Sequence, residues 1–148
     1  MSMPPEVLKK MVKKIDGWDI VVGSRFLPGG KDERAPSYPY LFSKVLNLLC
    51  QSFLYHDFRD YTSGFIAVKR KVLENLSLEG DYGEYFIILI AQSKKKGYKV
   101  LEIPYICEKR RYGKTKTSPD LLSYVKKGVK YLLGVSKGAK IKWERKRY

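Results

Sequence analysis

The strongest constraint on the fold is the short run Asp19-Ile-Val-Val-Gly23, in which β-branched residues follow one another without polar alternation. Such a run is typical of a strand that is covered on both faces and has neighbours in a sheet. A helical pattern precedes it, from Pro4 to Ile15. A complete doubly wound domain would normally begin with a strand that carries the first ligand loop. The order therefore predicts an α/β sheet that has lost its first strands.

The rest of the chain continues to alternate helical and strand patterns. Apolar spacing predicts helices over residues 38–55, 71–76 and 84–96, and a last helix that opens at Pro119. Residues 64–69 and 99–106 have the composition of strands. We expect the polar segments between them, including residues 24–36, to be loops. This order of elements is that of an α/β domain.

Positive charge is concentrated at one end of the chain. Residues 109–148 hold fourteen Lys and Arg residues against Asp120 and Glu144, which accounts for twelve of the fifteen net positive charges. Such a segment suits nucleic acid, a membrane surface or a phosphorylated substrate, and it also suits a merely solvated lysine-rich face. Cys50 and Cys107 lack the spacing of metal ligands, so the sequence favours a reducing cytosol and no zinc site.

Three short segments place polar side chains at the ends of expected elements. Gly23-Ser24-Arg25 follows the first strand, where open α/β sheets bind ligands, and its guanidinium could hold an anion or simply face solvent. Asp60 to Phe65 is either part of a pocket or a plain turn. Glu84 begins a helix, where its charge also suits the helix dipole.

A fourth segment, Arg110 to Thr117, contains four cations, two hydroxyls and a glycine. A polycationic loop of this kind can neutralise a diphosphate or a lipid phosphate from several directions. The alternative is a flexible loop whose charges are only solvated.

Taken together and in this order, these segments resemble a known family, the family 2 glycosyltransferases that charge polyprenyl phosphates (the dolichyl-phosphate mannosyltransferase-like class). The resemblance extends from residue 4 to about residue 133. The matching residues are Pro4-Pro5-Glu6, Gly23-Ser24-Arg25, Ser43, Asp60 with Ser63-Gly64-Phe65, Glu84, Glu102-Ile103-Pro104, and Arg110 with Gly113, Thr115 and Lys116. It implies a partial GT-A (Rossmann-like) nucleotide-sugar transferase fold that lacks its N-terminal strands, followed by an amphipathic helix.

The resemblance also implies a reaction. The complete enzyme would move a hexose, mannose or glucose, from a nucleotide-diphosphate sugar to a polyprenyl or dolichyl phosphate, with Mg²⁺ or Mn²⁺ on an Asp-x-Asp motif that precedes the matched segment. This chain alone would bind no metal, lack a complete catalytic set and be inactive. The family's phosphate contacts fall on Arg25, Arg110 and Lys116, and its acceptor and sugar pocket falls on Ser43, Asp60, Ser63 and Glu84.

Two positions depart from the family pattern. An Arg that often stands four residues before the embedded serine is replaced by Pro39, which makes Arg34 a candidate substitute. A second family Glu, later in the helix that Glu84 begins, falls on Ile88.

Residues 1–118 are expected to form the acceptor side of the transferase domain, and residues 119–148 a basic amphipathic helix and tail. Lys126, Lys127 and Lys130 lie opposite an apolar stripe, which indicates a helix in the headgroup plane at the cytoplasmic face of a membrane. The alternative is that the stripe packs on the protein's own core. The stripe consists of Leu121, Leu122, Val125, Val129, Leu132 and Leu133.

The expected partners follow from the incomplete sheet and the basic tail. They are the nucleotide sugar and polyprenyl phosphate, an anionic membrane surface, and a separately encoded N-terminal half or a second copy that pairs with the open strand at residues 19–23. Two other classes of function compete with the transferase: a basic nucleic-acid-binding module and a non-catalytic membrane-associated fragment. Nucleic acid is not favoured, because no recognition motif of the common folds is present.

Overall fold

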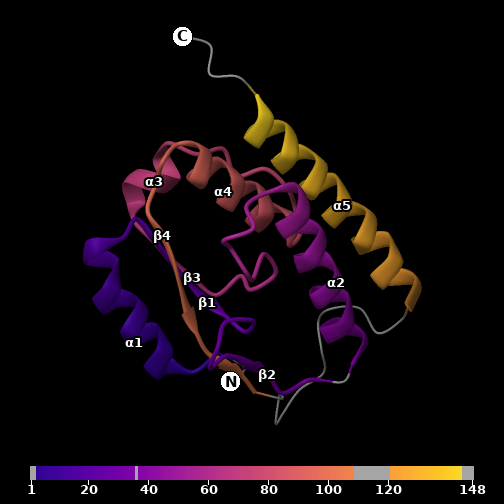
Figure 1. Ribbon diagram of the computed structural model, residues 1–148, viewed down its shortest axis with the longest axis horizontal. Coiled ribbons are helices and arrows are strands. Elements are labelled where there is room, and N and C mark those ends of the chain that lie inside the picture. Colours follow the sequence, from indigo (N-terminus) through magenta and orange to yellow (C-terminus); the bar gives the residue numbers. More distant parts are fainter. Residues whose placement is uncertain (1–2, 36, 109–120, 145–148) are drawn as a thin grey trace.

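A computed structural model of the chain describes residues 3–35, 37–108 and 121–144, with the side chains of the last segment described from Gly128 onward (Figure 1). The described residues form five α-helices and two small sheets, a mixed α/β arrangement. The predicted division of the chain at residue 118 falls outside the described residues.

The main sheet has the strand order β3-β1-β4. Its central strand, β1 (Ile20–Ser24), pairs antiparallel with β3 (Ile66–Val68) and parallel with β4 (Val100–Pro104). The expectation that residues 19–23 have an open side is therefore wrong, because the antiparallel strand β3 occupies that side. Self-association through β1 loses its structural basis.

Helices cover both faces of the sheet, which explains why β1 is apolar without alternation. Val21 lies in a cluster with Met11 of α1 (Pro5–Lys14), which the short 3₁₀ helix η1 (Ile15–Gly17) follows. Ile20 and Val22 face the opposite cluster, to which helices α2 (Tyr38–Phe53) and α4 (Glu84–Lys95) contribute. All five residues of β1 are buried.

Two of the remaining elements are shorter than the sequence patterns suggested. Helix α3 (Arg70–Glu74) directly follows β3. The expected strand at residues 99–106 divides into β4 and β5 (Ile106–Cys107), and β5 pairs in parallel with β2 (Lys31–Asp32). Strand β2 lies in a segment that the sequence predicted to be loop. Its pairing with β5 places Asp32 within hydrogen-bond distance of Arg25, the residue that follows β1.

Helix α5 (Leu121–Trp143) lies beside α2 and packs on α4 (Figure 1). Two glycines let it approach closely: a Cβ added to Gly134 would lie 2.9 Å from Cβ of Glu84, and one added to Gly138 would lie 3.1 Å from Cδ2 of Leu54. Val135, between them, belongs to the core. This approach accounts for the apolar character of α4 on nearly all sides, because α4 is covered by the sheet and by α5.

In the described part of α5, Gly134 and Gly138 face the core, and several apolar side chains are exposed to solvent. Val129, Leu132 and Leu133 are 54%, 54% and 58% exposed. The predicted stripe therefore does not pack on the core at these three positions. Leu121, Leu122 and Val125 lie outside the described side chains. Within the described part of the chain, no helix has the length and apolarity needed to cross a membrane.

Candidate functional site

Arg25, at the carboxyl end of β1, is the centre of a buried network of charges. Its Nε and Nη2 atoms donate hydrogen bonds to the two carboxylate oxygens of Asp60, at 2.9 and 2.7 Å. Nη2 also donates to Thr62 Oγ1 at 2.6 Å, and Nη1 donates to Asp32 at 3.2 Å. The side chain of Arg25 is only 4% exposed, and those of both carboxylates are fully buried. Burial alone would lower the pKa of Arg25, but Asp60 and Asp32 raise it above its ordinary value.

Asp32 joins this network to a second guanidinium. Arg34 donates from Nε to Asp32 Oδ1 at 2.7 Å and from Nη2 to Asp32 Oδ2 at 2.5 Å. Burial would raise the pKa of Asp32, but the hydrogen bonds and positive charge of Arg34 hold it below its ordinary value. The order Asp60, Arg25, Asp32, Arg34 therefore alternates in sign, so that each buried charge has an opposite neighbour. Arg34 is the member whose side chain reaches solvent, at 36% exposed.

The loop that carries Asp60 is fixed from β4 and β1. The carboxylate of Glu102 accepts hydrogen bonds from the backbone N–H groups of Arg59 and Asp60, at 2.7 and 2.9 Å. Ser63 donates from its hydroxyl to the carbonyl oxygen of Gly23. Burial raises the pKa of Glu102 above its ordinary value. The segments that contain Gly23, Asp60 and Glu102, which are distant in sequence, therefore meet at one point. Residues 60–65 are thus more than a plain turn, because Asp60 and Ser63 bond residues of other segments.

Helix α2 reaches the same network through Asn47. The Asn47 carboxamide accepts from the backbone N–H of Tyr61 at 2.6 Å, and it donates to Thr62 Oγ1 at 3.0 Å and to the backbone oxygen of Ser43 at 2.8 Å. Ser43 is partly exposed one turn earlier on the helix. One face of α2 is therefore tied to the charged end of β1.

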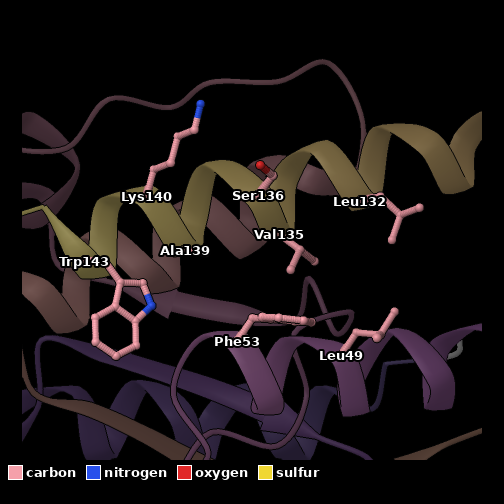
Figure 2. A pocket seen from close by; sticks show the side chains of 8 residues that line it. All are labelled: Leu49, Phe53, Leu132, Val135, Ser136, Ala139, Lys140 and Trp143. Carbon is pink, nitrogen blue, oxygen red and sulfur yellow. The ribbon is translucent and has the colours of Figure 1, made fainter.

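The opposite side of α2 lines an apolar groove of about 530 Å³ between α2 and α5. Figure 2 shows Val135 and Trp143 of α5 directed toward Phe53 and Leu49 of α2, whereas Lys140 extends away from α2. Trp143 is 73% exposed and Phe53 56%. The residues that line the groove are Leu49, Phe53, Leu132, Val135, Ser136, Ala139, Lys140 and Trp143.

The exposed apolar surface continues along α2 beyond the groove. Leu41, Val45 and Leu48 follow one another at helical spacing and are each more than half exposed. Large apolar patches on a soluble protein commonly mark a site for an apolar ligand, a membrane or another protein. We call the groove together with Leu41, Val45 and Leu48 the apolar α2–α5 surface.

The predicted site residues thus fall into three groups: those at or near the charged network, those outside the described residues, and Glu84. Arg25 and Asp60 belong to the charged network, Ser63 ties the loop of Asp60 to Gly23, and the backbone oxygen of Ser43 accepts from Asn47. In this arrangement Arg25 donates to protein carboxylates, so its predicted phosphate contact stays a prediction. Arg110 and Lys116 lie outside the described residues.

Glu84 lies apart from the charged network, at the first turn of α4 beneath α5. It is 8% exposed, and its Oε1 accepts from the backbone N–H of Asp81 at 3.2 Å. Its neighbour across the helix contact is Gly134. The structure shows a buried side chain at the α4–α5 contact, and the predicted role of Glu84 in a sugar pocket stays a prediction.

Sequence reasoning missed Asp32, Asn47 and Thr62 as members of the site. Asn47 had a usable signal, because it is a single amide within the otherwise apolar stretch from Val45 to Cys50. Asp32 had none, since it stands in a polar segment where a carboxylate is ordinary, and Thr62 lay within the candidate segment from Asp60 to Phe65 without being named as a site residue. Among the residues that the structure describes, no group of three or more His, Cys, Asp and Glu side chains could hold a metal ion.

Comparison with known proteins supports the family resemblance. The chain is 36% identical over 119 residues to a dolichol-phosphate mannosyltransferase of Pyrococcus furiosus, covering 78% of this chain and 33% of that protein. It is 32% identical over 121 residues to a polyprenol monophosphomannose synthase of Mycolicibacterium smegmatis, covering 79% of this chain and 46% of the relative. An undecaprenyl-phosphate mannosyltransferase of Micrococcus luteus is 26% identical over 121 residues, covering 79% and 49%.

The predicted resemblance is therefore confirmed over the matched region. The chain spans a third to about half of the length of the curated relatives that it matches. No profile of a known protein family matches it.

Proposed function

We propose that this chain, a homologue of polyprenyl-phosphate mannosyltransferases over 78% of its length, forms the acceptor side of a glycosyltransferase. The complete enzyme would move a hexose from a nucleotide-diphosphate sugar to a polyprenyl phosphate. All three relatives are named for mannose and for a polyprenyl carrier. Mannose is therefore the sugar that we propose.

The arrangement of α2 is the observation that carries this proposal. One side of the helix joins the charged network through Asn47, and the other side lines the apolar groove with Leu49 and Phe53. A polyprenyl phosphate has the same two parts, an anionic head and an apolar tail. A helix that is polar on one side and apolar on the other suits such an amphiphile, with the phosphate toward the network and part of the isoprenoid chain in the groove.

Arg34 is the described cation best placed to meet the phosphate. Its Nε and Nη2 atoms bond Asp32, which leaves the Nη1 N–H groups as further donors on a partly exposed guanidinium. Arg25 contributes its charge from within the network, and Arg110 and Lys116 are proposed to contribute further positive charge. A phosphate oxygen is already anionic near neutral pH, so the work of the site is positioning and charge neutralisation, and no strong general base is required.

The divalent ion belongs to another part of the complete enzyme in this proposal. The described residues do not provide a fitting set of ligands, so no step is assigned to a metal held by this chain. We expect Mg²⁺ or Mn²⁺ and the donor diphosphate to be held by the part of the relatives that this chain does not match. We expect the chain alone to be inactive for the same reason.

The apolar α2–α5 surface also supports peripheral attachment to the cytoplasmic face of a membrane. Its exposed side chains can enter the headgroup boundary, while Lys and Arg residues of the C-terminal segment are attracted to anionic lipids. The acceptor lipid is found in the same boundary layer. Attachment would therefore bring the chain to its substrate, and raised salt would weaken it.

Lipid binding can be followed through Trp143 in a Trp18→Phe background. We expect vesicles that contain polyprenyl phosphate to shift the emission of Trp143 to shorter wavelength, since the exposed indole enters an apolar environment. Vesicles with the uncharged polyprenol should give a weaker shift, and inorganic phosphate none. The emission would be read at equal lipid concentration and at two salt concentrations.

Two matched variants sharpen this test. Leu132 and Leu78 are 54% and 56% exposed, but only Leu132 lines the groove. Leu132→Gln should weaken the response and Leu78→Gln should leave it unchanged. Equal responses of both variants, or a shift with nucleic acid that exceeds the shift with lipid, would contradict the proposal.

A transfer assay tests the reaction itself. With a mannose nucleotide donor, polyprenyl phosphate and Mg²⁺ or Mn²⁺, the chain alone should give no product above background. Addition of a polypeptide that supplies the unmatched part of a relative should give transfer. Turnover by the chain alone would contradict the proposal that the donor and the metal ion are held by another part of the complete enzyme.

A further inference from the structure

Asn47 is an amide on the buried side of a helix whose other core residues are apolar. It is 3% exposed, and Leu46 beside it belongs to the hydrophobic core. Its Oδ1 atom accepts from the N–H of Tyr61 at 2.6 Å, and its Nδ2 atom donates to Thr62 Oγ1 at 3.0 Å and to the backbone oxygen of Ser43 at 2.8 Å. Both amide hydrogens are therefore used within the protein, and Asn47 has no donor left for a ligand.

The hydroxyl of Thr62 is used just as completely. Its oxygen accepts from Arg25 Nη2 at 2.6 Å and from Asn47 Nδ2 at 3.0 Å, and the hydroxyl donates to Asp60 Oδ1 at 3.1 Å. A hydroxyl has two lone pairs and one hydrogen, so all three are occupied. Thr62 therefore links α2 to the guanidinium of Arg25 and can act on a ligand only through these neighbours.

A second contact between α2 and the same loop is weaker. Gln51 and Arg59 share two hydrogen bonds of 3.4 Å at the surface, where water competes for both partners. The link through Asn47 and Thr62 lies deeper and is directional, so it holds α2 in one position relative to Arg25. Apolar packing fixes such a position less strictly, since a core tolerates several arrangements of similar volume. The buried link therefore sets where α2 stands relative to the charged network.

The same helix carries the apolar groove. Leu49 and Phe53 line it and follow Asn47 by two and six residues, which is about 3 and about 9 Å along the helix axis. A link that fixes Asn47 therefore also fixes the distance of the groove from the guanidinium of Arg25. A ligand whose anionic head and apolar tail are covalently joined binds best when that distance is constant, because neither the protein nor the ligand then has to rearrange.

We propose that Asn47 and Thr62 are positioning residues, which hold the groove at a set distance from the charged network so that the phosphate and the first isoprene units of one isoprenyl phosphate bind together. The inference rests on the proposed function and adds which part of the lipid is recognised. The groove is limited to about 530 Å³, so it takes the units next to the phosphate, and the far end of a long chain contributes little.

The test uses the full chain in the Trp18→Phe background, a soluble short-chain isoprenyl phosphate and the corresponding uncharged isoprenol. Dissociation constants would be read from the emission of Trp143. In this parent chain the phosphate should bind about tenfold more tightly than the alcohol, because the head gains charge-assisted bonds. Thr62→Val replaces the hydroxyl by a methyl group. It should remove most of this preference and leave the affinity for the alcohol unchanged.

Two further variants separate positioning from stability. Thr62→Ser keeps the hydroxyl and should keep the preference for the phosphate. Ser52→Ala is the matched control on α2, because the Ser52 hydroxyl donates to the carbonyl oxygen of Leu48 within the same helix. Its preference should equal that of the parent chain. A purely structural role of Thr62 would lower the free energy of unfolding, or both affinities alike, and leave the preference unchanged, so urea unfolding of each variant accompanies the titrations.

Hydrogen exchange at the Tyr61 amide keeps the test decisive if Thr62→Val does not fold. This amide donates to Asn47, so its exchange requires the loop to separate from α2. A ligand that spans the network and the groove binds only the joined state, and saturating isoprenyl phosphate should slow the exchange by about tenfold or more. The isoprenol, which contacts the groove alone, should leave the exchange unchanged.

The possible failures of the inference and of the proposed function differ. A preference for the phosphate that survives in Thr62→Val, or an exchange rate at Tyr61 that isoprenyl phosphate does not change, would overturn the inference and leave the proposed function in place. Loss of both affinities in a stable Thr62→Val chain would also overturn it, since the link would then serve the groove alone. Equal binding of phosphate and alcohol by the parent chain would contradict the proposed function, and the inference with it.

Discussion

The charged network and the apolar α2–α5 surface lie on two sides of the same helix and reverse the usual distribution of side chains. Inside, Arg25 and Asp60 are almost completely removed from solvent. Outside, Leu48, Phe53 and Trp143 are more than half exposed. Buried charges persist because each has an opposite partner at hydrogen-bond distance, whereas the exposed apolar residues have no such compensation within the described chain.

This difference indicates that the charged network serves the stability of the fold and that the apolar surface serves binding. Substitutions in the network should change the stability of the fold, because a broken buried pair leaves a charge without a partner. Substitutions of the exposed side chains on the apolar surface should change binding and leave stability alone, since those side chains bury little area in the free chain. Variants in the two regions should therefore differ in which of the two properties they change.

The largest effect is expected for Arg25→Leu. Loss of the guanidinium leaves Asp60 and Asp32 buried without their shared cation, which should lower the free energy of unfolding by about 3–5 kcal/mol. Arg59→Leu is the matched control, since Arg59 is exposed and, among the described residues, its guanidinium contacts Gln51 alone, so its effect should stay within about 0.5 kcal/mol. Urea unfolding of both variants measures the difference. Equal stabilities would mean that the network does not hold the loop.

A smaller effect, with a characteristic pH dependence, is expected for Asp32→Asn. Loss of the charge-assisted bonds to Arg25 and Arg34 should lower stability near neutral pH by about 1.5–3 kcal/mol. The pKa of Asp32 in the folded chain lies below its ordinary value of 3.8, so the unfolded chain takes up the proton first as pH falls. The Asp32 contribution is therefore complete above 3.8 and is lost as pH falls below that value.

Unfolding curves from neutral to acid pH check this assignment. The wild-type chain should lose stability below pH 3.8, and Asp32→Asn should show a flatter profile. Glu102→Gln is a useful control, because burial raises rather than lowers the pKa of Glu102 and its contribution has the opposite sign. Parallel profiles of wild-type chain and Asp32→Asn would contradict the role assigned to Asp32.

The apolar surface should respond in the opposite manner. Leu48→Gln is expected to change the free energy of unfolding by no more than about 0.5 kcal/mol, because Leu48 is 58% exposed. Its partition onto vesicles with anionic lipid should fall by about tenfold, the contribution of one leucine side chain transferred from water. Co-sedimentation with vesicles, beside thermal unfolding, compares the two properties. If Leu48→Gln were destabilised and bound vesicles normally, the apolar surface would serve stability, as the charged network does.

The smallest effect is expected for the ion pair between Lys137 of α5 and Glu79, at 3.3 Å. Both side chains are more than half exposed, so Lys137→Gln should lower stability by less than about 1 kcal/mol. Raised salt should reduce the difference further, whereas it should scarcely affect the loss in Arg25→Leu. Unfolding at low and high salt measures both. A large, salt-independent effect would mean that exposed pairs hold α5 in place.

The positions of individual helices and strands could be predicted from the sequence better than the pairing of the strands with one another. Helices α1, α2 and α4 and strand β1 lie within a few residues of their expected positions, since apolar spacing and glycine or proline stops act within one segment. Pairing depends on residues far apart, and there the prediction failed: β1 was expected to have an open side, and the short strand β2 was expected to be loop.

The candidate site was predicted in part for the same reason. Motif resemblance found Arg25, Asp60, Ser63 and the segment with Glu102. It could not find that Arg25 is paired with Asp32, because that contact depends on the pairing of β2 with β5. Nor could it decide which side of α5 faces the core, since the answer depends on close approach at Gly134 and Gly138, and glycine contributes little to a hydrophobic pattern.

The bonds from Glu102 to the backbone of Arg59 and Asp60 also bear on how the chain is made. Glu102 lies 42 residues after Asp60, so on a translating ribosome the loop and its buried carboxylate are finished well before their anchor exists. Contacts between residues so distant in sequence form late, because the intervening chain must first be closed into a loop. The nascent chain must therefore hold the loop of Asp60 through Arg25 and Gly23, without the bonds to Glu102, until β4 has emerged.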